Sequence, residues 1–468
     1  MAAKRDKPMP TGRIRRTAKV GGLVGGQAAK AYANRAANLT RDDDGKRAAN
    51  ERLQIKAAEQ IVDVLGQMKG AAMKVGQVAS FIDLNGLPPE AQEMFQAKLA
   101  ELRDSAPKVA FKDMRKVIEA DMGERLEDTF HEFEQDAVAA ASIGQVYRAR
   151  LPDGRRVAVK VQYPGVAQAV RADLQNLGLL LRAAKRMAPG LDPKAMAGEI
   201  RERMTEELDY EHEAQAQRAF ARAWRGHPFV VIPDVITGLS RERVLVTEWV
   251  DGMGFEDVRK LGQSERDRFG EIVFRFFFGS LYRMGHFSGD PHPGNYLLMA
   301  DGRVAFMDFG MTKRIPPAQI AMETGVIRAG LEGDATGLHS QLVAMGFYAA
   351  DDDAVDPARL LAHVQSLQGW YSEDREFTIT RNYVSRMMVD AGDPRSEYWD
   401  LMKRGTLPPE ALLARRMEGL TIGVLGQLNA TANWHRIMNE WLYSGPPATP
   451  LGEEEAAFHG ARPTRRAA

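Results

Sequence analysis

One segment, GHFSGDPHPGNYLLMADGRVAFMDFGM at residues 285–311, constrains this chain more than any other. It holds an acid, Asp290, an amide, Asn295, five positions later, and a second acid, Asp308, thirteen positions after that. Two short apolar runs separate Asn295 from Asp308, and the DG pair at 301–302 between them predicts a β-hairpin. Such a hairpin would bring Asn295 and Asp308 together at its open end. Two hard oxygen ligands with another carboxylate nearby suit Mg²⁺ on a phosphate chain, so the segment predicts a magnesium–phosphate site.

The composition excludes several classes of function. Lys plus Arg and Asp plus Glu each total 63 of the 468 residues, so the net charge gives no reason to expect nucleic acid as a partner. The chain has no cysteine, which excludes disulfides, thiolate zinc sites and cysteine nucleophiles. Its nine histidines form no HExxH pair, so we expect no dedicated transition-metal site.

The sequence gives no reason to expect a membrane span. No window approaches the roughly 20 apolar residues that a membrane-spanning helix needs. We therefore expect a cytoplasmic protein without a transmembrane helix. Residues 1–20 contain seven Lys or Arg and one acid, which predicts a disordered basic segment. A targeting role, or peripheral contact with a membrane surface, is the alternative interpretation of this segment.

The hydrophobic pattern divides the chain into five parts. A disordered basic segment at 1–45 precedes a helical extension at 46–125, where apolar residues recur every three or four positions. Residues 126–250 are rich in alternating β-branched residues and predict a small antiparallel sheet interrupted by a helix. Residues 251–444 predict a larger helical lobe that holds the hairpin. The Pro- and Gly-rich tail at 445–468 is expected to be disordered.

A strand lysine and an alanine-rich loop precede the hairpin segment. In VAVK at 157–160, Lys160 lies on the strand face opposite its valines, and an exposed lysine is the plain alternative. Upstream, AAASIGQV at 139–146 has the spacing of a G-x-G-x-x-G-x-V phosphate loop, with alanine at the first two glycine positions. The order strand, loop, strand, lysine and then the hairpin predicts phosphoryl-transfer chemistry. The candidate ATP-binding residues are Ala139, Ala140, Ala141, Ser142, Gly144, Val146, Lys160 and Glu213.

Each candidate then has a role. Lys160 would neutralise α- and β-phosphate charge and needs a carboxylate to hold it. The stretch EELDYEHEA offers Glu207, Asp209 and Glu213, and the last two, four positions apart, would share a helix face. A solvated acidic face is the alternative interpretation there.

The hairpin segment supplies the remaining roles. Asp308 would bind Mg²⁺ with Asn295 as the second protein ligand. Asp290 would accept a proton from the attacking hydroxyl or water, or orient it. His292, between two prolines, is expected to have a structural role.

Four motifs together resemble the ABC1/AarF/UbiB (COQ8-like) atypical kinase family. They are KVGQ at 74–77, AAAS at 139–142, ELD at 207–209 and GDPHPGN at 289–295, and the resemblance covers about residues 46–315. It implies an α+β, protein-kinase-like bilobal fold with a small antiparallel N-lobe sheet, a helical N-terminal extension and a larger helical C-lobe. It also implies that ATP and Mg²⁺ are cofactors.

The family implies further roles that the spacing does not. The KxGQ helices would form a lid that brings Lys74 and Gln77 to the nucleotide, with Lys74 near Glu207 and Asp209. Glu213 would then be the partner of Lys160. The family acts as ATPases, or as small-molecule or lipid-directed kinases, in ubiquinone or other isoprenoid-lipid metabolism, so a lipid or isoprenoid small molecule is the expected partner. UbiB-type members often carry C-terminal membrane spans, and this sequence shows none.

Two other functions remain open at this point. A nucleotide-gated lipid-binding protein or chaperone would bind Mg-ATP without turnover. A soluble small-molecule phosphotransferase would share a loop like GDPHPGN, although the KVGQ and alanine motifs argue against it.

Overall fold

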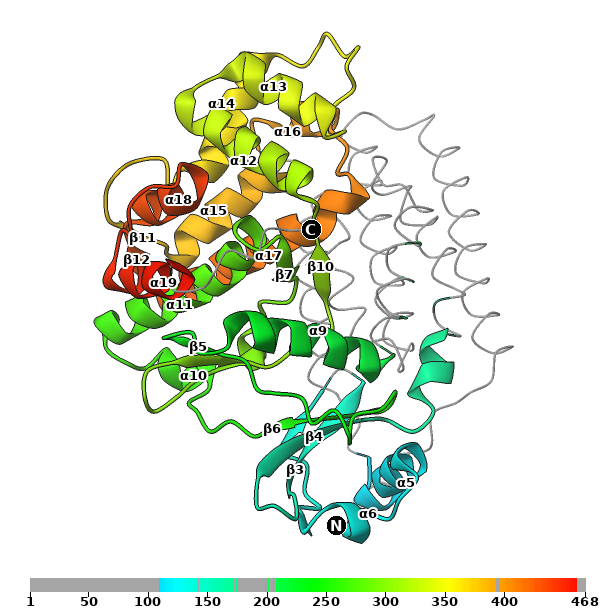
Figure 1. Cartoon of the computed structure of the whole chain (residues 1–468). Helices are drawn as coiled ribbons and strands as arrows, with labels where there is room; N and C mark the ends of the chain where they lie inside the picture. The colour runs from blue at the N-terminus through cyan, green and yellow to red at the C-terminus, as the bar shows by residue number, and fades with distance from the viewer. Residues whose placement is uncertain are drawn as a thin grey trace, which may run out of the picture. The chain divides into compact units, whose positions relative to one another are not determined.

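A computed structural model of the chain describes residues 109–141, 143–171, 208–392 and 396–460, with single positions at 174, 198, 201 and 205 (Figure 1). The candidate residues Lys74, Gln77, Ser142 and Glu207, and most of the expected helical extension, lie outside the described residues. The chain divides into two compact units, Met1–Glu211 with Ile236–Thr247, and His212–Val235 with Glu248–Ala468.

Among its described residues, the first unit contains a small sheet, two named helices and a helical stretch at 166–171. Its elements are α5 (Phe111–Met122), α6 (Leu126–Thr129), β1 (Glu132–Phe133), β2 (Ala139–Ala140), β3 (Gly144–Arg150), β4 (Arg156–Gln162) and most of β6 (Val244–Glu248). The strand order is β1-β3-β4-β6, with β2 also paired to β3. The pairs β1–β3, β2–β3 and β3–β4 are antiparallel, which confirms the predicted small antiparallel sheet.

The β3–β4 pair follows from period-two alternation. Val157, Val159 and Val161 are completely buried, whereas Lys160 between them is only half-buried. The connecting turn uses Gly154 at φ +88°, a conformation that other residues rarely adopt. Asp153 stabilises this turn, since its carboxylate accepts the backbone N–H of Arg155 at 3.0 Å.

The second unit is mostly helical. Its elements are most of α9 (Tyr210–Trp224), β5 (Val230–Val231), α10 (Phe255–Val258), α11 (Gln263–Tyr282), β7 (His286–Ser288), η3 (Pro293–Asn295), β8 (Tyr296–Leu298), β9 (Val304–Phe306), β10 (Thr312–Arg314), α12 (Pro317–Glu332), α13 (Ala335–Ala344), α14 (Pro357–Gln368), β11 (Phe377–Thr378), α15 (Arg381–Gly392), α16 (Trp399–Met402), α17 (Pro409–Leu428), β12 (Thr431–Ala432), α18 (Trp434–Leu442) and α19 (Pro450–Gly460). None of the helices among the described residues has the length and apolar character needed to cross a membrane.

Helix α11 forms the centre of this unit. Every residue from Phe269 to Tyr282 is buried, so the helix has no solvent face over that stretch. It packs against α17 and β7 (Figure 1). Phe276 stacks on Phe306 of β9 with ring centroids 3.8 Å apart. The central helix therefore supports the β8–β9 hairpin from behind.

Two expected boundaries differ from the structure. Residues 212–235, expected in the N-lobe at 126–250, belong to the second unit, where β5 pairs in parallel with β9. The tail expected to be disordered contains helix α19, in which Leu451 and Glu455 are buried. Glu455 of this helix has a buried cationic partner that no local pattern reveals.

That partner is Arg275 of α11, whose side chain is fully buried. Its guanidinium donates to Glu271 at 2.7 Å, to Glu440 of α18 at 2.8 Å and to Glu455 of α19 at 2.9 Å. Burial raises the pKa of Glu455, and the positive charges of Arg283 and Arg275 oppose that shift. One buried cation thus joins three helices through charge-assisted hydrogen bonds.

We expect Arg275→Met to lower the free energy of unfolding by about 3–5 kcal/mol, because it removes the buried cation that donates to Glu440 and Glu455 and leaves these carboxylates only the longer contacts of Arg283, at 3.5 and 3.6 Å. Urea unfolding followed by tryptophan fluorescence measures the loss. The matched control is Arg359→Met, which removes an exposed pair with Asp400 at 2.8 Å and should leave the unfolding midpoint almost unchanged. Equal destabilisation of the two variants would contradict this prediction.

Candidate active site

The predicted hairpin is present. In β8 and β9, Tyr296 pairs with Phe306, and Met307 N–H donates to Asn295 O at 2.9 Å. Gly302 in the turn has φ +82°. Asn295 and Asp308 therefore lie at the open end of the hairpin, which confirms the geometric prediction.

The GDPHPGN loop, residues 289–295, holds its acid in a fixed position. Asp290 is buried, and Asn295 Nδ2 donates to its carboxylate Oδ2 and to its backbone oxygen, each at 3.2 Å. Because the nitrogen of the amide serves Asp290, the amide oxygen of Asn295 is the atom suited to bind a cation. His292 Nδ1 accepts the N–H of Gly294 at 3.0 Å and caps η3, which fits the expected structural role.

Two neutral side chains surround this loop. Burial raises the pKa of Tyr296 well above its usual range, and the Asp290 charge adds to the shift. The Tyr296 hydroxyl donates to Pro291 O at 3.3 Å. Burial, together with the positive charge of Arg314, lowers the pKa of His286 to about 4. Both side chains therefore stay uncharged near neutral pH, and Tyr296 supports the loop through its hydroxyl.

Helix α17 packs directly on the GDPHPGN loop. A Cβ at Gly289 would lie 2.3 Å from Leu413 Cδ1, so only glycine allows this approach. One turn further along α17, Arg416 Nη2 lies 3.6 Å from Asp290 Oδ1, and the two side chains are 7% and 8% exposed. Sequence reasoning missed Arg416. The signal was a pair of arginines, 415–416, inside an otherwise largely apolar helix, but local spacing does not identify their partners.

Asp308 lies beside a second carboxylate. Its Oδ1 accepts the N–H of Gly310 at 3.0 Å. A Cβ at Gly310 would lie 3.4 Å from Asp308 Oδ1 and 3.5 Å from Glu213 Oε2, so the two carboxylates flank this glycine. Glu213 is 2% exposed. Two turns along α9, Phe220 packs on Phe309 with ring centroids 4.7 Å apart, and α9 therefore contacts this segment twice.

The expectation that Asp209 and Glu213 share a helix face is wrong. Helix α9 begins at Tyr210, and Asp209 is an exposed residue just before it. Its Oδ1 accepts the N–H of Glu211 at 2.9 Å. Aspartate is favoured at this position because its carboxylate satisfies an N–H that the first turn leaves unpaired. Glu213 alone of the two is buried within the helix.

In the first unit, the alanine loop and the strand lysine lie on adjoining strands. Ala139 pairs with Val146, and Val146 pairs with Lys160 on the next strand. The Lys160 ammonium lies 5.1 Å from the centre of the Tyr210 ring, within cation–π range. Lys160 thus extends from the strand face opposite the buried valines, as predicted.

Glycine is required at one position of this loop by the sheet itself. A Cβ at Gly144 would lie 2.1 Å from the backbone oxygen of Val161. Ala139 and Ala140 are exposed, and Ala141 N–H donates to Gly144 O at 2.8 Å to close the turn. The alanines place methyl groups on this turn, whereas glycines would leave its backbone uncovered by side chains.

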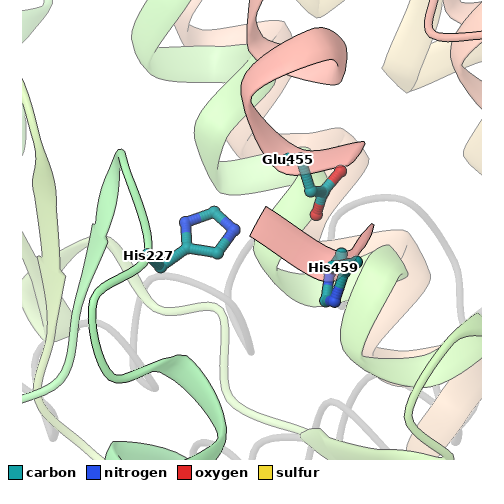
Figure 2. A group of neighbouring side chains, drawn as sticks. All are labelled: His227, Glu455 and His459. Atoms are coloured by element: carbon teal, nitrogen blue, oxygen red, sulfur yellow. The ribbon is translucent and has the colours of Figure 1, made fainter. Parts of the chain in front are cut away.

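Another group of possible ligands lies elsewhere in the second unit. Among the described residues, His227, Glu455 and His459 form a group whose ligand atoms all lie within 4.8 Å of one another. Figure 2 shows a ring nitrogen of His227 directed toward the other two side chains. Its Nδ1 accepts the N–H of Val230 at 3.2 Å, which places the proton of the neutral ring on Nε2. A metal would need that nitrogen deprotonated, so we assign no metal to this group.

Comparisons with known proteins agree with the motifs. The family model described as "ABC1 atypical kinase-like domain" matches residues 101–342. The mitochondrial atypical kinase COQ8B of Danio rerio is 30% identical over 334 residues, covering 70% of this chain and 53% of that protein. The mitochondrial atypical kinase COQ8 of Saccharomyces cerevisiae is 27% identical over 348 residues, covering 73% and 68%. The chain spans about half the length of several curated relatives that it matches.

A solved structure supports the fold. The complex of Rv3197 with erythromycin, from Mycobacterium tuberculosis, is 31% identical, with a TM-score of 0.61, covering 85% of this chain and 98% of that one. The expected kinase-like α+β fold is therefore present. The chain belongs to the ABC1 atypical kinase-like family.

Proposed function

We propose that this protein is an Mg-ATP-dependent atypical kinase or ATPase that supports ubiquinone or other isoprenoid-lipid metabolism. One observation carries the proposal: Asn295 donates to Asp290 at the same end of the hairpin where Asp308 lies. An acid held by an amide, beside a second acid, is the arrangement that phosphoryl transfer requires.

The donor set fits Mg²⁺. This ion takes hard oxygen ligands and is commonly held by one or two carboxylates together with substrate phosphates. Asn295 uses its nitrogen for Asp290, so its oxygen is one proposed ligand, and the Asp308 carboxylate, whose Oδ1 accepts Gly310 N–H, is the other. When bound, the ion would neutralise phosphate charge.

Lys160 and the alanine loop would hold the nucleotide. Lys160 would neutralise the α- and β-phosphates, and Glu213 is its proposed partner, as the family resemblance implies. Asp290 would orient the attacking hydroxyl or water and accept its proton. Lys74 and Gln77, with Glu207 and Asp209, keep their proposed role as a lid.

A second candidate function is binding without turnover. The exposed alanines at 139–140 favour it, because side chains there hinder the close backbone approach to phosphate that glycine permits. A solved relative is a complex with erythromycin, a small molecule, which is consistent with ligand binding in this family.

We expect Asp308→Asn to lower ATP hydrolysis by about 10²-fold or more, because it removes a charged ligand of the metal. The measurement is ADP release by the purified full chain with Mg²⁺ and lipid or detergent. Asp301→Asn is the matched control, since Asp301 is exposed at the turn of the same hairpin and should leave the rate within about twofold. Equal ADP release by the wild type and Asp308→Asn would reject catalysis at this site.

Melting temperature separates turnover from binding alone. Nucleotide at roughly 100 times its Kd should stabilise the protein by about 2.7 kcal/mol, and EDTA should remove most of this effect. Asp290→Asn should keep the stabilisation, because Asp290 is not a proposed metal ligand, and should lose ADP formation. Stabilisation in the wild type without any ADP formation would favour the binding function.

A further inference from the structure

The segment that contains the proposed catalytic groups has almost no positive charge of its own. Between residues 285 and 311, the one Lys or Arg is Arg303. It lies at the hairpin turn and pairs with Asp301 at 2.7 Å. Asp290 lies at the other end of the segment. A cation for Asp290 must therefore come from another element.

Helix α17 supplies that cation. Arg416 Nη2 lies 3.6 Å from Asp290 Oδ1, while Asn295 Nδ2 contacts the other carboxylate oxygen at 3.2 Å. The carboxylate is thus held on one oxygen by an amide and on the other by a guanidinium. The distance between Arg416 Nη2 and Asp290 Oδ1 is that of an ion pair and is longer than a hydrogen bond. Such distances in active sites often shorten when substrate binds.

The second nitrogen of the guanidinium contacts a junction in the backbone. Arg416 Nη1 donates to Gly289 O at 3.5 Å and lies 3.4 Å from Met311 Sδ. Gly289 N–H donates in turn to Met311 O at 2.7 Å. Met311 directly follows the Asp308–Phe309–Gly310 motif, so one side chain touches the residue before Asp290 and the residue after this motif.

We propose that Arg416 is a positioning residue for Asp290. It balances the charge of the buried carboxylate and fixes the loop before Asp290 against the segment after Gly310. This inference rests on the proposed function. It predicts that Arg416 affects the chemical step more than nucleotide binding, because it contacts Asp290, Gly289 and Met311.

The test is steady-state kinetics of ADP release by the full chain. Arg416→Ala should lower kcat by about 10²-fold while the KM for ATP changes by less than about twofold, since misplacement of a reacting group costs rate more than binding. Millimolar guanidinium chloride should restore part of the rate of Arg416→Ala by occupying the vacated volume. The kcat of Arg416→Lys should be higher than that of Arg416→Gln. These two variants replace Arg416→Ala in the test if the alanine variant does not fold.

The adjacent Arg415 provides the matched control. It lies on the same helix but pairs with Glu323 and with Glu418, away from Asp290. Arg415→Ala should lower the melting temperature, keep kcat within about twofold at temperatures where the protein is folded, and gain nothing from guanidinium.

Each remaining outcome is decisive. A kcat of Arg416→Ala within twofold of the wild type, or a loss that guanidinium and lysine do not repair, would overturn the role of Arg416 and leave the proposed function intact. A wild type whose ADP release does not depend on Asp308 would remove the proposed function and this inference together.

Discussion

The backbone register of β8 and β9 is the constraint on which the site depends. Tyr296 pairs with Phe306 and Asn295 lies opposite Met307, so Asp308 follows one position beyond the last pair and both residues stand at the open end. A shift of this register by one residue would change which residues reach that end and on which face their side chains lie. Helix α11 holds this register from behind through the stacking of Phe276 on Phe306. The placement of Asn295 and Asp308 at the end of the hairpin thus depends on packing in the hydrophobic core.

Guanidinium groups, fully buried at Arg275 and partly buried at Arg415, connect the helices of the second unit. Arg275 joins α11 to α18 and α19, and Arg415 joins α17 to α12 through Glu323. Such groups are costly to bury and repay the cost only when every partner is in place. They therefore contribute more to specifying which helices pack together than to the stability of the fold. Arg416 follows the same pattern, except that its partner is Asp290 instead of a structural carboxylate.

Local patterns predicted much of this molecule from the sequence. The hairpin, the β3–β4 pair and the position of Lys160 on the strand face opposite the valines follow from alternation and turn residues, which act over a few positions. What could not be predicted depends on long-range contacts. Arg416 meets the loop 127 positions earlier in the chain, and Glu455 meets Arg275 across 180 positions. The predicted helix face of Asp209 was wrong for a local reason, because spacing alone does not distinguish a residue that caps a helix from a residue within it.

The close approach of Leu413 to Gly289 has a consequence for how this protein can be divided. The match to the family model ends at residue 342, whereas the helix that presses on the acid-bearing loop begins at Pro409. A fragment that ends at residue 342 would retain the acid-bearing loop and the hairpin and lose the helix that packs behind them. The part of the chain that supports this loop therefore extends beyond the match to the family model, and its far boundary is set by a steric contact.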